Sequence, residues 1–487
     1  MLFNSYPFIF VFLPLTLLGC LVLARFSRRV ALAYVAAASL VFYGYWAPKY
    51  LLLLVPSLVV NYALGRLIAR TRSKAWLVAG LAGNLAVIGW FKYSLFLYLT
   101  ATGGATPPDF LRGIVLPLGI SFITFQKIAY LVDVWRGRHA EDAFDRFAFF
   151  VLFFPQLIAG PIVLYREIEP QLARWPGRSG YLAASFQVGL VYFAIGLFKK
   201  VVLADALAPF ANDIFKYASL GGPLAWSDAW LGALAYSLQL YFDFSAYSDM
   251  ALGLGRMFGF RLPINFNSPY KARDIIDFWR RWHMTLTRFF RDYVYIPLGG
   301  NRKGLPKQVL FILIVFFLTG LWHGAGWTFV LWGSIHGVLV AANHLWNVAC
   351  ARWSARGQLS DRVLAAGRLA MRATTLVAVI ALWVVFRADS WPTALRMLGS
   401  MTDPSAVIDL RALRDPNDYP VLYAMLAVLW PLALAAPSSH QLVIAMRRWR
   451  VGAGLRRWIP AAATGAALYL AIASIAKVQS AFIYFNF

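Results

Sequence analysis

Two histidines, His323 and His283, are the residues of this sequence most able to do chemistry. His323 follows the run 310–321, which contains no charged residue, and Gly324 and Gly326 remove side chains beside it. An ionisable group in such a run costs free energy on insertion into a membrane, so it marks a candidate functional site. Histidine has an ordinary pKa of about 6.5, which suits a general base at neutral pH. The alternative interpretation is a structural histidine bonded between helices.

His283 lies in a segment with the periodicity of an amphipathic helix. Between Arg273 and Val294, the apolar and aromatic side chains fall on one arc of a helical wheel and the charged ones fall on the opposite arc. A turn-and-cap sequence, Asn267-Ser268-Pro269, precedes the segment, and Pro297 follows it. We therefore predict one continuous helix, at the cytoplasmic membrane interface or in the mouth of a funnel, with His283 facing inward.

Other ionisable residues in apolar surroundings are weaker candidates for catalysis. His336 would point away from His323 on a continuous helix, so the two could share a pocket only if the helix broke at Gly324–Gly326. We interpret His336 as structural. Asp243 and Asp249 are six residues apart and lie on different faces of a helix, so they do not suit paired acid–base catalysis. They predict instead a buried hydrogen-bonded network or the lining of a polar tunnel. The sequence suggests no metal site and no nucleotide-binding loop.

The composition is that of a membrane protein. Of 487 residues, 60% are hydrophobic and 14% are charged, against about 45–50% and about 25% in soluble domains. Nearly uncharged runs approach the length needed to cross about 30 Å of hydrocarbon; they include 7–24, 50–64, 75–91, 185–198 and 309–322. Because a backbone in lipid must satisfy its own hydrogen bonds, we predict an all-α polytopic protein of roughly 11–13 transmembrane helices plus interfacial or re-entrant helices. We treat residues 1–487 as a single membrane domain whose chemically rich segment spans about 239–344.

The net charge of +25 does not indicate a nucleic-acid partner. The basic residues cluster in short connections between apolar runs, such as 25–29, 66–74 and 447–457. That pattern is typical of helix orientation and of attraction to anionic lipid headgroups. Membrane lipid is therefore the expected partner of this charge.

Seven strings occur in order along the chain and together resemble a known family. They are Leu116–Phe122, Phe154–Ile162, Tyr241–Met250, Asn265–Tyr270, Phe278–His283, Tyr295–Arg302 and Leu321–Gly324. The chain resembles the membrane-bound O-acyltransferase family, and most closely its bacterial alginate O-acetyltransferase-like branch. The resemblance implies a ring of helices around a central tunnel, with His323 matching the signature histidine of the family and His283 matching its second histidine.

The resemblance also implies a reaction. Members of this branch pass acetyl groups from a cytoplasmic donor, acetyl-CoA in our expectation, toward an exported polysaccharide such as alginate. They lie in the bacterial inner membrane as multi-pass proteins, hold no bound cofactor, and work with extracytoplasmic acetyltransferase- or esterase-like partner proteins. We expect the same donor, acceptor, partners and location here.

Within this reaction we hypothesise that His323 is the general base, while His283 orients a substrate or stabilises the oxyanion. Further candidates for binding substrate or donor are Arg280, Arg281, Trp282, Asn267, Asp243, Trp322, Arg288 and Arg291. The arginines suit the phosphates of CoA, and anionic lipid is an equal alternative. Alternative functions are acylation of cellulose, peptidoglycan, teichoic acid or a lipid, and a non-enzymatic transporter, export component or secretion scaffold.

Overall fold

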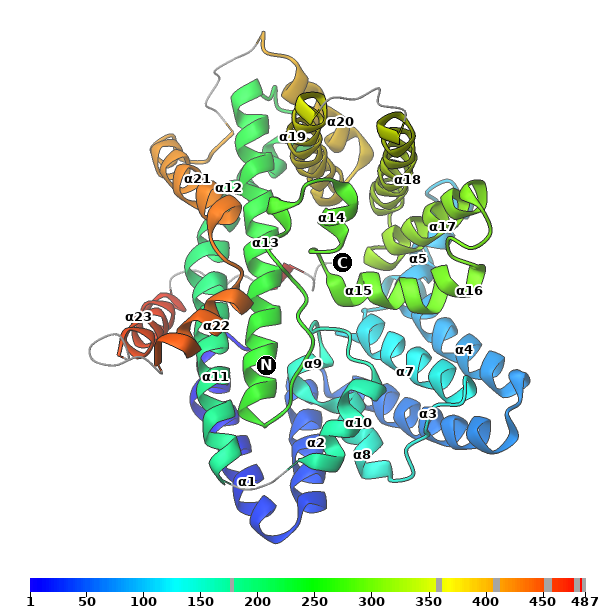
Figure 1. The fold of residues 1–487 in the computed structure, drawn as a ribbon. Coiled ribbons are helices and arrows are strands. Elements are labelled where there is room, and N and C mark those ends of the chain that lie inside the picture. Colours follow the sequence, from blue (N-terminus) through cyan, green and yellow to red (C-terminus); the bar gives the residue numbers. More distant parts are fainter. Residues whose placement is uncertain (176–178, 356–360, 406–411, 451–457, 477–481, 484–487) are drawn as a thin grey trace. The chain divides into compact units, whose positions relative to one another are not determined.

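The computed structural model describes residues 1–175, 179–355, 361–405, 412–450, 458–476 and 482–483 (Figure 1). Every regular element in these residues is helical, and they contain no strand. The prediction of an all-α polytopic membrane protein is therefore confirmed.

The chain divides into two compact units. The first comprises Met1–Phe198, Ala246–Ile264 and Val443–Ile475, and the second comprises Lys199–Ser245, Asn265–Leu442 and Ala476–Phe487. The long helix α13 (Trp226–Met257) contributes its first part to the second unit and its last part to the first. Both candidate histidines belong to the second unit.

The first unit is built from short and long helices of the N-terminal half. These are η1 (Phe8–Phe12), α1 (Leu13–Phe26), α2 (Arg28–Gly44), η2 (Pro48–Tyr50), α3 (Leu51–Thr71), α4 (Lys74–Ile88), η3 (Gly89–Tyr93), α5 (Ser94–Ala101), α6 (Asp109–Arg112), α7 (Ile120–Trp135), α8 (Phe144–Leu152), α9 (Phe154–Leu157), α10 (Tyr165–Arg174) and α11 (Ser179–Phe198), with α22 (Ser439–Arg450) from Val443 onward and α23 (Ile459–Ser474) from the C-terminal part. In Figure 1, α3, α4 and α7 lie side by side. The side chains of Asn61 and Asn84 hydrogen-bond each other between α3 and α4. Each amide also donates to a carbonyl of its own helix, so both polar groups are satisfied in apolar surroundings.

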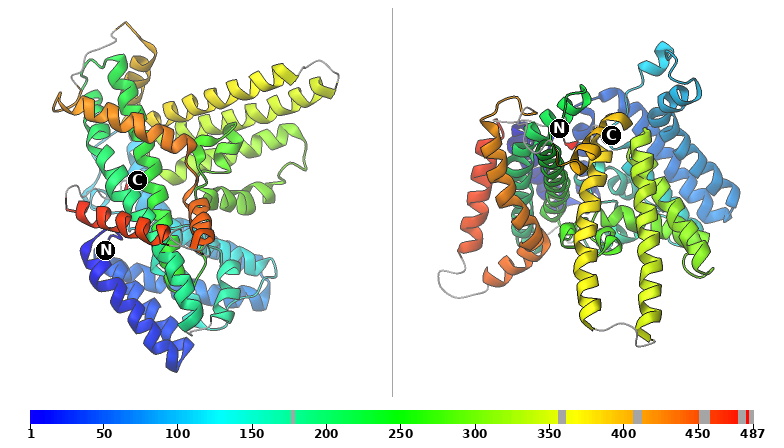
Figure 2. Two further views of the ribbon diagram at one scale, coloured as in Figure 1. Left: turned by 60° about the vertical axis from the view of Figure 1, so that its left-hand side comes forward. Right: turned by 90° about the horizontal axis from the view of Figure 1, so that it is seen from above.

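The second unit holds the candidate site. Its helices are η4 (Lys199–Ala204), α12 (Asp205–Ser219), the first part of α13, η5 (Pro269–Lys271), α14 (Ile275–Trp279), α15 (Met284–Phe290), η6 (Arg291–Tyr295), α16 (Ile296–Leu298), α17 (Leu305–His323), α18 (Trp327–Ala355), α19 (Asp361–Arg387), α20 (Trp391–Thr402) and α21 (Asp418–Ala435). Figure 2 shows α18 and α19 running alongside each other as long yellow-green and yellow helices.

Helices α17 and α18 form a tight hairpin because glycines let their backbones approach. A Cβ added at Gly320 would lie 2.4 Å from the carbonyl oxygen of Phe329, and one added at Gly333 would lie 2.4 Å from that of Phe316. Small residues at a helix interface permit such close packing in membranes. The hairpin turn occupies Gly324–Gly326, so the helix break on which a shared pocket for His323 and His336 depended is present.

The predicted continuous helix through His283 is wrong. The segment forms α14 and then α15, separated by a turn in which His283 adopts a left-handed backbone with φ of +43°. Two backbone hydrogen bonds explain the break: Asn267 N–H donates to the Arg281 carbonyl at 3.0 Å, and Met284 N–H donates to the Asn265 carbonyl at 2.9 Å. The extended chain at 265–267 thus takes over hydrogen bonds that a continuous helix would form internally.

Seven helices among the described residues are long and apolar enough to span a membrane. They are Phe8–Phe26, Pro48–Thr71, Lys74–Ala101, Leu305–His323, Trp327–Ala355, Ala365–Arg387 and Asp418–Ala435. Three of the five predicted uncharged runs, 50–64, 75–91 and 309–322, fall within these spans, and 7–24 does so except for Pro7. The fifth run, 185–198, lies in α11. The count of seven covers the described residues only, and it leaves out shorter apolar helices such as the 16-residue α7, which is almost wholly buried. Their apolar side chains serve internal packing.

The α17–α18 hairpin generates a first prediction. Gly333→Ala places a methyl group against the backbone of α17, and overpacking of this kind costs about 1–3 kcal/mol. We expect a lower apparent melting temperature for the detergent-purified protein. The matched control is Gly399→Ala in α20, where an added Cβ meets nothing within 4 Å. Equal melting temperatures for the two variants would contradict the tight packing.

Candidate active site

His323 is the last residue of α17, where aromatic rings enclose it. Its ring centroid lies 4.9 Å from Trp322, 5.0 Å from Trp332 and 5.4 Å from Phe386 of α19. The next residue, Gly324, is extended and ends the helix. The side chain is 3% exposed, so the sequence-based prediction of a histidine in an apolar setting describes its surroundings correctly.

His283 lies beside His323. The two ring centroids are 6.3 Å apart, and the ring of Phe244 from α13 packs edge-on against His283 at 4.7 Å. His283 is fully buried, and this burial lowers its pKa from 6.5 to about 3. The imidazole is therefore neutral at physiological pH and able to accept a proton. Although the helix around it breaks, His283 faces inward as predicted.

The two predicted tryptophans have different places. Trp322 contacts both histidines, with centroid distances of 5.8 Å to His283 and 4.9 Å to His323. Trp282 instead stacks on Phe278 at 5.7 Å and packs against Trp383 at 4.8 Å. Trp322 is thus part of the wall around the histidine pair, whereas Trp282 supports the turn that carries His283.

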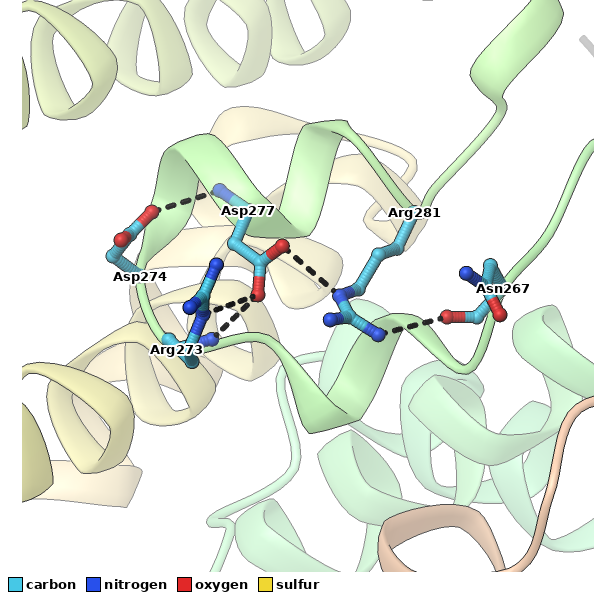
Figure 3. Close-up of polar contacts among 5 residues, drawn as sticks. All are labelled: Asn267, Arg273, Asp274, Asp277 and Arg281. Atoms are coloured by element: carbon cyan, nitrogen blue, oxygen red, sulfur yellow. Dashed lines mark hydrogen bonds and ion pairs between the residues drawn. The ribbon is translucent and has the colours of Figure 1, made fainter.

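Arg281 belongs to an internal brace that Figure 3 shows in detail. The Asp277 carboxylate accepts hydrogen bonds from Arg281 Nε at 3.0 Å and from the backbone N–H of Arg273 at 3.1 Å. Arg281 also donates to the backbone carbonyl of Asn267 at 3.4 Å, and Asp274 caps α14 by accepting from Asp277 N–H. These contacts hold the 265–267 segment against the α14–α15 turn, and Asn267 takes part through its main chain.

A cavity of about 530 Å³ opens between α14, α15, η6, α17 and α18 of the second unit. Its polar lining includes Arg280, Arg291, Asn301, Gln308 and His344, and its apolar wall includes Trp279. Thr319 also lines it, and this residue precedes His323 by one turn of α17, a rise of about 6 Å. The cavity wall therefore comes within one turn of α17 of His323.

The four predicted arginines separate into two groups. Arg280 and Arg291 line the cavity and are exposed, with Arg291 Nε also 2.8 Å from the Asp292 carboxylate. Arg281 and Arg288 do not line it. The cavity thus brings together two of the four guanidinium groups with a neutral polar rim, which suits an anionic group attached to an apolar or uncharged chain.

Asp243 lies in a buried charge cluster. Lys200 Nζ is 2.7 Å from the carboxylates of both Asp243 and Asp205, and all three side chains are nearly inaccessible. Asp243 also accepts a hydrogen bond from the backbone N–H of Ile483 at 2.9 Å. These contacts correspond to the buried network predicted for this segment. Within the described residues, no group of three metal-ligand side chains comes together.

His336 lies in the aromatic wall behind the site. Trp279 Nε1 donates to His336 Nδ1 at 3.3 Å, and the ring of Trp332 lies 4.9 Å from His336 and 5.0 Å from His323. An indole N–H can only donate, so His336 carries its proton on Nε2. His336 therefore orients Trp279 of the cavity wall, and Trp332 separates the two histidine rings.

Sequence reasoning missed Asn265, a 1% exposed residue beside the histidine pair. Its side-chain oxygen is 3.2 Å from His283 Nδ1. No local periodicity marks it, because its partners lie across the α14–α15 turn. The only signal in the sequence is its place in Asn265–Tyr270, one of the seven strings that carry the family resemblance.

These features define an all-helical, multi-pass membrane protein with a buried histidine pair beside an arginine-edged cavity. The family profile described as MBOAT, membrane-bound O-acyltransferase family, matches residues 143–367, a range that contains both histidines and the cavity. The chain belongs to this family, and it is accordingly an O-acyltransferase.

Individual relatives cover most of the chain. A peptidoglycan O-acetyltransferase of Helicobacter pylori is 37% identical over 100% of this chain and 98% of its own length. A protein of Azotobacter vinelandii named probable alginate O-acetylase AlgI is 40% identical over 82% of this chain and 78% of its own length. A protein of the same name from Pseudomonas aeruginosa is 41% identical over 82% of this chain and 75% of its own length. The similarity thus includes the whole candidate site.

The Asp277 brace generates a pH prediction. Burial raises the pKa of this carboxyl, but hydrogen bonds from Arg281 and from the Arg273 backbone outweigh it and hold the pKa below its ordinary value. Asp277→Asn removes the charge and should cost about 1–3 kcal/mol of stability at pH 7. A depressed pKa stabilises the fold above the unfolded pKa of about 3.9, and the benefit is lost as pH falls through the lower folded value.

We therefore expect the difference in melting temperature between the wild type and Asp277→Asn to be largest at pH 7 and to shrink below about pH 4. Asp274→Asn is the control, because asparagine caps a helix as well as aspartate does. A difference that stays constant across this pH range would show that the Asp277 charge does not stabilise the turn.

Proposed function

We propose that this protein transfers acetyl groups from a thioester donor to hydroxyls of an exported polysaccharide. The observation that carries the proposal is the pair of buried histidine rings, 6.3 Å apart, at the end of a membrane-spanning helix. Acyl transfer to a hydroxyl needs a group that accepts the hydroxyl proton and a donor that stabilises the oxyanion. The two histidines of the pair supply these roles between them.

The donor in this proposal is acetyl-CoA, bound from the cytoplasmic side in the cavity that Arg280 and Arg291 edge. Guanidinium groups bind phosphates through charge-assisted hydrogen bonds. Thr319 of the cavity wall lies one turn of α17 from His323, so an uncharged pantetheine-like arm held in the cavity would have about 6 Å of helix rise to cover toward the histidine pair. No bound cofactor is needed, since the acyl group arrives on its own carrier.

The acceptor in this proposal is alginate or a similar cell-envelope glycan. Support comes from the relatives, whose names specify alginate in several Pseudomonas species and peptidoglycan in Helicobacter pylori. A relative from Bacillus subtilis, 29% identical over 54% of this chain, is named teichoic acid D-alanyltransferase. An exported glycan places the protein in the bacterial inner membrane, and extracytoplasmic acetyltransferase- or esterase-like proteins complete the transfer.

Replacing either histidine with alanine tests the catalytic assignment. We expect His323→Ala and His283→Ala to lower acetyl transfer by about 10²–10⁴-fold, the range that general acid–base assistance contributes. The measurement is transfer of labelled acetyl groups by the protein in native membranes, together with its melting temperature after purification. His139→Ala is the control, because this histidine is exposed between α7 and α8.

A folded His323→Ala or His283→Ala variant with full transfer would remove that residue from the mechanism. Failure of the wild type to consume any acetyl thioester, with partner proteins and glycan present, would instead favour the transporter or scaffold alternative. The first outcome tests the role of a histidine in a variant, whereas the second tests the activity of the wild-type protein, so the two can be told apart.

The donor cavity is tested through its arginines. Arg280→Ala and Arg291→Ala should each raise the KM for acetyl-CoA about tenfold, the effect of losing roughly 1.4 kcal/mol of binding, with little change in kcat. Arg368→Ala, an exposed residue of α19 outside the cavity, should leave the KM unchanged. If all three variants behave alike, the cavity is not where the donor phosphates bind.

A further inference from the structure

Asn265 is placed to fix the proton of His283. The residue is 1% exposed. Its carboxamide oxygen lies 3.2 Å from Thr285 N, 2.9 Å from Thr285 Oγ1 and 3.2 Å from His283 Nδ1. All three contacts converge on one atom of the side chain, opposite the turn that carries His283.

The chemistry of these contacts determines which ring nitrogen of His283 carries the proton. A backbone N–H can only donate, so the Asn265 atom that meets Thr285 N is the carbonyl oxygen and not the amide nitrogen. That oxygen has no proton to give, and His283 Nδ1 must therefore donate to it. A neutral imidazole has one N–H, which leaves a lone pair on Nε2.

The backbone makes this arrangement rigid. Met284 N–H donates to the Asn265 carbonyl, so Asn265 bonds to the turn through its main chain as well as its side chain. His283 itself is held in the left-handed region, a conformation that costs a non-glycine residue about 1–2 kcal/mol and persists only where surrounding contacts enforce it. Asn265 supplies two of these contacts.

We propose that Asn265 is a positioning residue that makes His283, through Nε2, the member of the pair that takes the proton from the acceptor hydroxyl. The inference rests on the acyl transfer proposed above. It leaves His323 to stabilise the oxyanion, which reverses the roles hypothesised from the sequence. A lone pair at Nε2 cannot donate to an oxyanion, so His283 in this form is unsuited to that second role.

The hydroxyl oxygen bonds to the acetyl carbon of the thioester while its proton moves to His283 Nε2. The carbon–sulfur bond then breaks, and the imidazolium returns the proton to the leaving thiolate, giving an acetyl ester and a free thiol. The negative charge of the tetrahedral intermediate favours the protonated ring while it exists, which offsets the burial that otherwise keeps His283 neutral.

Within the part of the chain that the structure describes, the titratable side chain that faces His283 from α17 is His323, at 6.3 Å between ring centroids. From α13 the contacting ring is Phe244, and the adjacent Asp243 is paired with Lys200. Phe266 and Trp322 also lie against the His283 ring. A carboxylate introduced at position 265 would bring a negative charge to the Nδ1 side of the imidazole.

The test compares Asn265→Asp with Asn265→Leu. Aspartate keeps all three acceptor contacts and adds a negative charge that stabilises the imidazolium, so it should raise the pKa of His283. We expect activity to be retained near pH 8 and the acid limb of kcat/KM to move upward by at least one pH unit. Leucine keeps the volume but removes the acceptor, and we expect kcat to fall by about 10²–10⁴-fold at every pH, as when a partner that fixes a histidine tautomer is lost.

The matched control is Asn212→Asp, an exposed asparagine that accepts a hydrogen bond from Arg387, whose pH profile should superimpose on that of the wild type. Each variant is assayed in membranes after its melting temperature confirms folding. If Leu fails to fold, the Asp profile alone decides the question.

An Asn265→Asp profile identical to that of the wild type, or a folded Asn265→Leu variant with activity within twofold, would overturn the role of Asn265. Absence of acetyl transfer by the wild type would refute the proposed function itself. The two failures are therefore distinguishable.

Discussion

The site depends on the pairing of the extended segment 265–267 with the turn between α14 and α15. Two backbone hydrogen bonds and the Asp277–Arg281 pair hold this turn in place. Without them the sequence from 273 to 294 would form one amphipathic helix, and His283 would lie on its edge. The pairing instead stops α14, turns the chain through a left-handed residue and places His283 against α17.

The second constraint is the enclosure of polar groups by aromatic rings. An imidazole in an apolar interior needs hydrogen-bond partners for its ring nitrogens. Asn265 meets one nitrogen of His283, and the indole N–H of Trp279 meets one nitrogen of His336. The partners impose opposite tautomers on these rings, because a carbonyl oxygen accepts and an indole donates. Similar surroundings therefore yield an acceptor nitrogen on His283, in the proposed reaction centre, and a structural ring at His336 behind it.

The sequence predicted the parts of this arrangement that local pattern controls. The run before His323 identified a spanning helix. A helix break at Gly324–Gly326 was considered only as the condition under which His323 and His336 could share a pocket, and the structure has the break there. The break at His283 was not predictable from periodicity, since it depends on hydrogen bonds to a segment outside the helix. Arg281 was assigned to phosphate although Asp277 stands four residues before it, a spacing that favours an ion pair on a helix.

The charge cluster around Asp243 connects residues 482–483 with the surroundings of His283, all within the second unit. Lys200 neutralises part of the charge of Asp205 and Asp243, and the remaining acceptor capacity of Asp243 is used by the N–H of Ile483. Phe482 then packs on Phe244 with centroids 5.8 Å apart, and the same Phe244 ring packs on His283. A buried carboxylate destabilises the fold unless its oxygens accept hydrogen bonds. The charge cluster and residues 482–483 therefore stabilise each other. The ring that supports His283 is thereby held on two sides, from α13 and from the end of the chain.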